Sequence, residues 1–563
     1  MATIHRFLKD AKFYFDSALA SMAGGNYETA VKELLHALYL EKNDDYLRVL
    51  ADCYFCLNSY SASSQAIYEL MRENPSVEHL LMLARNRFFT NGGENASDFL
   101  FETIASADNA FLPDDAGLEE AEDDEILSQI IDSWREPFNS PDLVHLKASE
   151  IRDSRNLLRA IKEFESGNYD KTIMFALNVK KDSEKYLETL ELITVSASLN
   201  GDTELLKEKL NELKDLDPAS AIAFKIEIEA MLKEGKSIKD PEVSTRIDIY
   251  LAMHLEEKSD SRLLKIQGML IALGAHAHGF KVSEMILDLL GASEFALFNH
   301  AVCAYAIGKK EIALKSSQKL SALYPNDSRG KVVAYLAENK PRVKEWRELL
   351  YRFPSGRIHD IYFAISVEMV RVKEGEYITR RAIDLIDILL LSEDSEAVYL
   401  LEKIIKTHKG LKAFLLSKLY DEYLSVEFRF DLLKVLLYGG INTMVVLPVE
   451  DRVLLGKIKS ATRINDSLFN DVYSNVLIAL FETDDLKGHR VVLESAVAEM
   501  SLTKSRLKRL NILCAVAHYY TVNDIFSADG LKYSSEMFGT TVSSLKKYLK
   551  EYRLPRMNFP KDF

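Results

Sequence analysis

The sequence predicts an all-α fold, a superhelical solenoid of antiparallel helix pairs, and three observations support this prediction. A pattern of small residues, a turn residue and a later proline recurs along the chain. Apolar residues follow helical rather than alternating spacing, as in Val31, Leu34, Leu35 and Leu38. Helix-breaking residues are few, with 12 prolines and 23 glycines in 563 residues. A solenoid suits this length because each repeat packs only against its neighbours.

The recurring pattern is clearest around three turn residues, Asn58, Gly201 and Gly308. Each is followed seventeen residues later by a proline, and these are Pro75, Pro218 and Pro325. Small residues such as Ala301 and Ala313 flank the turn, so that two antiparallel helices can approach closely. Glycine at the turn adopts the left-handed backbone that ends the first helix, and proline ends the second.

Two further units contain the same turn, Gly25-Asn26-Tyr27 and Gly167-Asn168-Tyr169. With their period of about 34 residues, these units resemble the tetratricopeptide repeat. Residues 11–76 make the best tandem pair, residues 150–218 a second pair and residues 293–326 a single unit. The resemblance implies a right-handed superhelix whose concave surface holds a peptide or a helix of another protein.

Breaks in this pattern divide the chain into five parts. They are N-terminal repeats (1–111), an acidic linker (112–126), a second repeat block (127–340), degenerate helical repeats (341–503) and a C-terminal helical unit (504–563). The linker holds eight acidic residues within 114–125, and their repulsion favours an exposed, mobile connection that limited proteolysis should cut first. The alternatives are a docking site for a basic partner and a segment packed in a groove of the same chain.

One short segment departs from the helical pattern. Residues 444–447 form the clearest β-like run and follow the break at Gly439-Gly440. We expect helices to resume over residues 449–502, and we expect no sheet of more than two strands.

Composition favours a cytoplasmic protein. The N-terminus lacks the apolar core of a signal peptide, and no run of about 18 uncharged apolar residues is present to span a membrane. Four cysteines do not make a disulfide framework in a chain of this size, and they fit a reducing compartment. The net charge of −15 argues against nucleic-acid binding over the whole surface.

No residue pattern predicts catalysis, a metal or a cofactor. Cys53 and Cys56 have the spacing of a redox or metal pair, but no second pair completes a zinc site, so we expect two small core residues. His276 and His278 lie near glycines and are expected in a loop without a third ligand. The sequence contains no glycine-rich phosphate-binding motif, nucleophile elbow or zinc-protease motif. We therefore predict a non-enzymatic protein.

The C-terminal unit resembles a helix-turn-helix. Helices are expected over residues 510–520, 529–538 and 542–552, with Gly539 in the turn before the last of them. Ser535, four positions before that glycine, supplies the small residue of the motif. The apolar residues expected to pack these helices together are Leu510, Leu513, Val516, Ala517, Phe538, Leu545 and Tyr548.

The last of these helices has a polar outward face. Its residues are Thr541, Ser543, Ser544, Lys546, Lys547 and Lys550. Residues 529–563 hold seven basic and four acidic side chains, a local excess of positive charge on an acidic chain. Such a face can contact phosphates and base edges. A terminal repeat also needs a polar outer face for solubility, and we favour this second role, closing the helical array or binding protein.

The leading functional prediction is a non-enzymatic scaffold that binds a peptide or protein partner on the concave surface. Helical register places first-helix residues on that surface, namely Asp52, Phe55, Asn299, Val302 and Ala306. The alternative prediction is a DNA-binding regulator, in which the repeats sense a partner and the C-terminal unit reads DNA.

Overall fold

The computed structural model describes residues 10–91, most of 153–254, 260–339 and 358–552, with short gaps in the second and fourth ranges. Within these residues the regular structure is helical, apart from one two-stranded sheet and a single bridge between Tyr377 and Lys409. The predicted all-α solenoid is therefore confirmed. The acidic linker, residues 112–126, lies outside the described residues.

The N-terminal stack consists of two helix pairs and one further helix. These are α1 (Ala11–Ala23) with α2 (Tyr27–Leu40), α3 (Asp44–Cys56) with α4 (Tyr60–Glu73), and α5 (Val77–Asn91). Their bounds match the tandem pair expected over residues 11–76.

A second run of helices follows helical residues between 153 and 164. It comprises α9 (Tyr169–Ala176), α10 (Tyr186–Asn200), α11 (Thr203–Leu216), α12 (Ala221–Lys233), α13 (Pro241–His254), α14 (Asp260–Ala272), α15 (His276–Leu290), α16 (Glu294–Ala306), α17 (Lys310–Leu323) and α18 (Ser328–Asn339). The unit expected over residues 293–326 is the pair α16 and α17.

The remaining helices are shorter or less regularly paired. They are α19 (Ile358–Val370), α20 (Arg380–Leu390), α21 (Ser395–Ile404), α22 (Leu411–Lys418), α23 (Val426–Gly439), α24 (Ser467–Glu482), α25 (His489–Leu502), α26 (Leu510–Val522), α27 (Ala528–Met537) and α28 (Val542–Glu551). The sheet lies between α23 and α24.

The turns between paired helices have the backbone that the repeat pattern predicts. All five turn residues adopt positive φ, between 54° and 83°, and they are Gly25, Asn58, Gly167, Gly201 and Gly308. The three prolines each lie two residues beyond the last residue of a helix. The small residues expected between the helices, among them Ala18, Ala30, Ala301 and Ala313, are completely buried. Close packing of helix pairs therefore follows from local sequence.

The sheet pairs β1 (Asn442–Pro448) with β2 (Val453–Lys459) in an antiparallel hairpin, with Val446 opposite Leu455. The β-like run at residues 444–447 is confirmed, but the expectation that helices resume over residues 449–502 is wrong at β2. Val453, Leu454 and Leu455 are all buried, so both faces of this strand are covered. A strand buried on both faces loses the alternation that identifies strands in a sequence.

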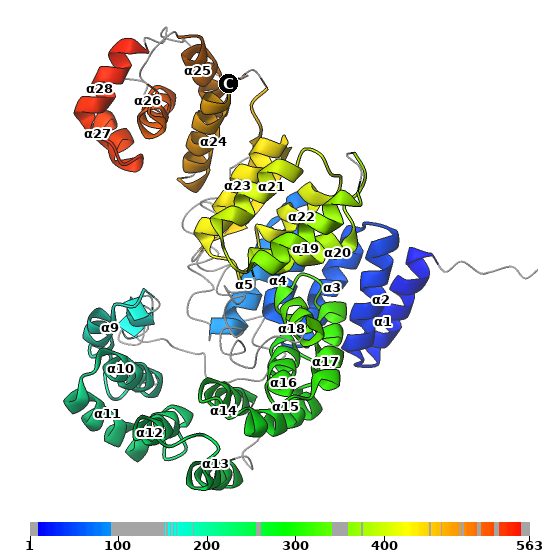
Figure 1. Cartoon of the computed structure of the whole chain (residues 1–563), viewed down its shortest axis with the longest axis vertical. Coiled ribbons are helices and arrows are strands. Elements are labelled where there is room, and N and C mark those ends of the chain that lie inside the picture. Colours follow the sequence, from blue (N-terminus) through cyan, green and yellow to red (C-terminus); the bar gives the residue numbers. More distant parts are fainter. Residues whose placement is uncertain are drawn as a thin grey trace, which may run out of the picture.

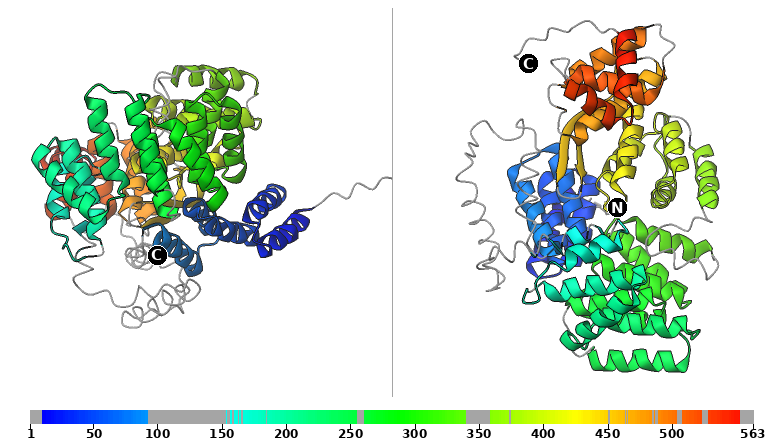
Figure 2. Two further views of the ribbon diagram at one scale, coloured as in Figure 1. Left: turned by 90° about the horizontal axis from the view of Figure 1, so that it is seen from below. Right: turned by 90° about the vertical axis from the view of Figure 1, so that its left-hand side faces the viewer.

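The N-terminal stack folds back onto the middle of the chain (Figure 1). Residues of α1–α4 share one hydrophobic core with α15–α18, and this core includes Tyr54 and Tyr324. Tyr68 of α4 shares a second core with Tyr420 and both strands. Figure 2 shows α1–α5 beside these later elements from two further directions. Neighbours in space are therefore not always neighbours in sequence.

Candidate protein-interaction surface

Asp52 and Phe55, the predicted contact residues of α3, face α5. Arg85 of α5 donates a hydrogen bond to Asp52 at 2.9 Å, and its guanidinium lies 4.1 Å from the centre of the Phe55 ring. The Phe55 ring also meets the edge of Phe89, at 5.1 Å between ring centres. Both residues are partly exposed, and their contacts with Arg85 and Phe89 pack α3 against α5.

The predicted contact residues of α16 have different environments. Asn299 donates a hydrogen bond to Gln267 of α14 at 3.0 Å, and Ala306 is partly exposed. Val302 is completely buried, so its predicted role as a partner contact is wrong. The prediction from helical register assumed that one face of α16 is free. In the structure α16 packs against α15, α17 and α18, and nine of its 13 residues are buried.

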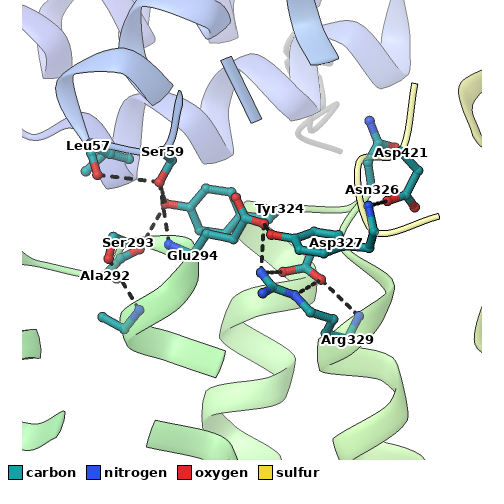
Figure 3. Close-up of polar contacts among 12 residues, drawn as sticks. Leu57, Ser59, Ala292, Ser293, Glu294, Tyr324, Asn326, Asp327, Arg329 and Asp421 are labelled. Atoms are coloured by element: carbon teal, nitrogen blue, oxygen red, sulfur yellow. Dashed lines mark hydrogen bonds and ion pairs between the residues drawn. The ribbon is translucent and has the colours of Figure 1, made fainter. Parts of the chain in front are cut away.

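The fold-back of the N-terminal stack creates a polar junction at Tyr324, just after α17 (Figure 3). The Tyr324 hydroxyl accepts a hydrogen bond from Ser59 at 2.9 Å and donates one to the Ala292 carbonyl at 3.0 Å. The hydroxyl of Tyr54 donates to the Leu323 carbonyl at 2.6 Å. Buried hydroxyl groups that find such partners fix the position of α3 and α4 against α16 and α17.

Next to this junction, Arg329 of α18 binds two buried carboxylates. It donates to Asp327 through two nitrogens at 3.0 and 2.8 Å, and to Glu294 at 2.9 Å. Tyr423 donates its hydroxyl proton to Glu294, and the ring centre of Tyr423 lies 3.8 Å from the guanidinium. Phe298 lies on the same guanidinium at 4.7 Å. Three distant segments of the chain thus meet at one cation.

Electrostatics in this cluster favour a protonated acid. Burial and the charge of Asp327 raise the pKa of Glu294, Arg329 lowers it, and the net result is a pKa of about 8. One arginine cannot offset two carboxylates that are removed from water. The hydrogen bonds and ring contacts of this cluster join three segments of the chain.

A cleft of about 180 Å³ opens beside the junction. Its lining is mostly apolar on the side of the N-terminal stack, which also contributes Gln65 and Glu69, and acidic at Glu294 of α16 and Asp327 of the loop after α17. The residues include Leu35, Leu38, Leu47, Leu50, Tyr54, Glu69, Glu294 and Asp327. No basic side chain lines this cleft among the residues that the structure describes.

A second buried charge cluster lies close to the first. Lys418 contacts Asp387 at 2.6 Å and Asp421 at 2.9 Å, and Lys331 also contacts Asp387 at 2.5 Å. The Ser328 hydroxyl donates to Asp387 at 2.5 Å. Every carboxylate here has a cation within contact distance, as buried charges require. Sequence reasoning missed both clusters, because their members are far apart along the chain.

Neither candidate metal site is supported. Cys53 is buried but Cys56 is exposed, so the expectation of two core residues is wrong for Cys56, which lies near the end of α3. His276 begins α15 instead of lying in a loop, which corrects that expectation, and His278 lies 3.2 Å from Asp248. Across the described ranges, no group of three or more His, Cys, Asp or Glu side chains is arranged to hold a metal ion.

The C-terminal unit has the helices and the turn that the sequence predicts. Gly539 has a φ of 59°, and the Thr540 amide donates to the Ser535 carbonyl at 2.8 Å. Leu545 and Tyr548 are buried, as expected. Leu510 is exposed, so its predicted burial is wrong; it is the first residue of α26, at the edge of the packed surface.

The polar face of α28 points outward in part. Thr541 caps the helix by accepting a hydrogen bond from the Ser544 amide at 3.1 Å, and Ser544 is half-buried. The remaining predicted residues, Ser543, Lys546, Lys547 and Lys550, are exposed. Their role in DNA contact stays a prediction.

No protein-family model matches the chain, and no curated protein matches it. Among solved structures, yeast Tom70 is 15% identical, with 75% of this chain and 96% of Tom70 covered and a TM-score of 0.26. The Cut9–Hcn1 hetero-tetramer of the APC/C is 12% identical, with 96% of each chain covered and a TM-score of 0.25. The tetratricopeptide domain of P58(IPK) is 13% identical, with 58% and 97% covered and a TM-score of 0.20.

These scores are too low for the neighbours to add to the argument, so the assignment of the fold rests on the helices themselves. No helix in the described ranges combines the length and the apolar character needed to cross a membrane. The paired helices, the left-handed turn residues and the buried alanines make the chain an all-α solenoid that resembles tetratricopeptide repeats.

Proposed function

We propose that the chain is a non-enzymatic scaffold that holds a peptide or protein partner on the inner face of its middle repeats. The inner face is the side on which the first helices of successive pairs, α10, α12, α14 and α16, lie beside one another. In solenoids this side forms an extended binding surface.

Exposed apolar side chains on the inner face support this proposal most directly. Lys265 of α14 donates to Glu191 of α10 at 2.9 Å, a contact that identifies this face on both helices. Leu187 lies one turn before Glu191, and Phe295 lies one turn before Asn299; both are exposed. Apolar groups beside charged ones suit an amphipathic helix or peptide, which would cover them on binding.

A paired substitution tests the proposal. Leu187→Asp with Phe295→Asp should remove the partners that the wild-type protein retains from native cytosol, as measured by quantitative mass spectrometry after affinity purification. Leu216→Asp is the matched control, because Leu216 is 56% exposed on α11, the second helix of its pair. Both variants must share the wild-type melting profile. A wild-type protein that retains no partner, or a double variant that retains the same partners, would contradict the proposal.

The proposal includes a cytoplasmic location and assigns no catalytic role. The four cysteines, Cys53, Cys56, Cys303 and Cys514, are all free thiols, which fits a reducing compartment. In the second buried charge cluster the Ser328 hydroxyl is bonded to Asp387 and Lys418, but Ser328 is almost fully buried, so that a substrate does not reach it.

A second candidate function is DNA binding by the C-terminal unit, favoured by the exposed lysines of α28. The full chain should then bind duplex DNA with a steep dependence on salt, because phosphate contacts release counterions. Changing Lys546, Lys547 and Lys550 to Glu should abolish this binding. The control changes three exposed lysines elsewhere to Glu, namely Lys207, Lys233 and Lys239. Equal loss in both triple variants, or no binding at low salt, would exclude this function.

A further inference from the structure

We propose that a second surface, distant in sequence from the inner face of α10–α16, docks an acidic peptide segment of a partner protein. We call this surface the lysine–tyrosine strip. It consists of Tyr377, Tyr399, Lys403, Lys406, Lys409, Lys412 and Tyr438. The lysine–tyrosine strip is separate from the inner face, because none of its residues belongs to the repeats from α10 to α18.

The strip begins with a pattern in the sequence. Lysines occupy every third position from Lys403 to Lys412, and the ten residues between and including them contain no acid. These residues include the end of α21, the following turn and the start of α22, which lie beside the end of α23 (Figure 1). The partly exposed Glu402 directly precedes Lys403, and the exposed Glu376 and Glu396 lie shortly before Tyr377 and Tyr399, so that no acid lies between the lysines.

Backbone contacts hold the strip in one place. The Lys409 amide donates to the Glu376 carbonyl at 2.9 Å, and the Ile378 amide donates to the Lys409 carbonyl at 3.0 Å. The Lys412 ammonium donates to the Gly440 carbonyl at 3.0 Å, which links the start of α22 to the end of α23. The lysines are therefore arrayed on a fixed backbone and not on a free loop.

Each of three lysines lies over the face of a different tyrosine. The distances from ammonium nitrogen to ring centre are 3.9 Å for Lys403 on Tyr399, 3.5 Å for Lys406 on Tyr438 and 5.9 Å for Lys409 on Tyr377. The three tyrosines are 60%, 48% and 75% exposed, respectively. Such pairing restricts the long lysine side chains before any ligand arrives, and so lowers the entropy lost on binding.

This arrangement selects for one chemistry of ligand. The lysines cover one face of each ring, so nucleic-acid bases cannot stack on those faces as they do in single-strand binding proteins. The ammonium groups keep donors toward solvent, and the phenol hydroxyls add further donors. Carboxylate oxygens are the matching acceptors, and an acidic peptide would meet a positive strip on a chain whose net charge is −15.

The test measures fluorescence anisotropy of labelled probes on the full chain at low ionic strength. The probes are a peptide that alternates glutamate and glycine, the same peptide with glutamine, and a single-stranded oligothymidylate. We expect the glutamate peptide to bind, with affinity that falls as salt rises, and the glutamine peptide not to bind. Lys403→Glu with Lys406→Glu and Lys409→Glu should weaken binding by about tenfold or more, since three contacts change sign.

The matched control is Lys207→Glu with Lys233→Glu and Lys239→Glu, which changes net charge equally but lies on α11, α12 and the turn after α12. It should weaken binding by less than about twofold, because distant exposed charges are screened. If the strip variant loses its melting transition, Lys406→Glu alone replaces it, with a smaller loss expected. The proposal would be overturned if both triple variants lost the same affinity or if the glutamate peptide did not bind. It would also be overturned if the oligothymidylate bound more tightly than the glutamate peptide and the strip variant lost that binding.

Discussion

Two clusters of buried charge meet at the first turn of α18, and burial affects their acids in opposite ways. In the Arg329 cluster a single cation serves both Glu294 and Asp327. Burial and the neighbouring charge of Asp327 together outweigh Arg329 and raise the pKa of Glu294 to about 8. With both acids ionised the cluster would hold more negative charge than its cation offsets, so Glu294 keeps its proton at neutral pH.

The Lys418 cluster has two cations for two acids. Burial alone would raise the pKa of Asp387, but the charges of Lys418 and Lys331 more than offset it, and the pKa lies below its ordinary value. Asp387 and Glu294 are both almost fully buried. The number of cations for each carboxylate, not the depth of burial, therefore decides which acid stays ionised at neutral pH.

The largest expected effect is in the Lys418 cluster. Lys418→Met should lower the free energy of unfolding by about 3–5 kcal/mol, because it leaves Asp421 buried without its cation. Urea unfolding followed by circular dichroism should show this loss at both pH 6 and pH 8, since Asp387 stays ionised throughout. A loss below about 1 kcal/mol would mean that water already solvates this cluster.

The effect of the corresponding substitution in the Arg329 cluster should depend on pH. Arg329→Met should cost about 3–5 kcal/mol at pH 9, where Glu294 is mostly ionised in the wild-type protein, and less at pH 6, where Glu294 is protonated with or without its cation. Urea midpoints at the two pH values measure the difference. Equal losses of stability at the two pH values would contradict the difference in charge balance between the two clusters.

Glu294→Gln isolates the raised pKa. A carboxyl whose folded pKa exceeds its unfolded value of about 4.5 favours folding at low pH, and this advantage is lost as pH rises toward 8. Between pH 6 and pH 8 the wild-type protein should lose up to about 1.4 kcal/mol per pH unit relative to the variant. Parallel stability profiles for the two proteins would contradict the raised pKa.

The smallest expected effect concerns the hydrogen bonds that join the N-terminal stack to the region beside the Arg329 cluster. Tyr324→Phe removes the bonds to Ser59 and Ala292 and should cost about 1–3 kcal/mol. Tyr362→Phe is the control, because the Tyr362 hydroxyl has no hydrogen-bond partner among the described residues. Thermal melting should separate the two variants, and equal melting curves would show that this junction adds no stability.

Local features of the fold could be predicted from the sequence. The turn residue Asn58 and the buried pair Ala301 and Ala313 act within one helix pair, so a few neighbouring positions suffice to identify them. The helices of the C-terminal unit could be predicted for the same reason. β2 could not be identified, because burial on both faces removes its alternation.

Contacts between distant segments could not be predicted. Val302 lies on the expected face of α16, yet packing by other helices buries it, and a single sequence does not reveal such packing. The Arg329 cluster unites residues from three segments, with Glu294 and Tyr423 separated by 129 positions. The lysine–tyrosine strip did leave a signal in the sequence, the four lysines spaced by three, although two of its tyrosines, Tyr377 and Tyr438, come from other parts of the chain.

The fold-back of the N-terminal stack has a consequence for how the protein is made. Tyr54 bonds to Leu323, which lies 269 residues later in the chain. At a synthesis rate of about 5–20 residues per second, the ribosome needs about 13–54 s to supply that partner. During this interval the docking side of α1–α4 has no native partner and exposes apolar side chains that the mature protein buries. The nascent chain therefore passes through an aggregation-prone stage, set by its topology, during which a chaperone has a defined surface to cover.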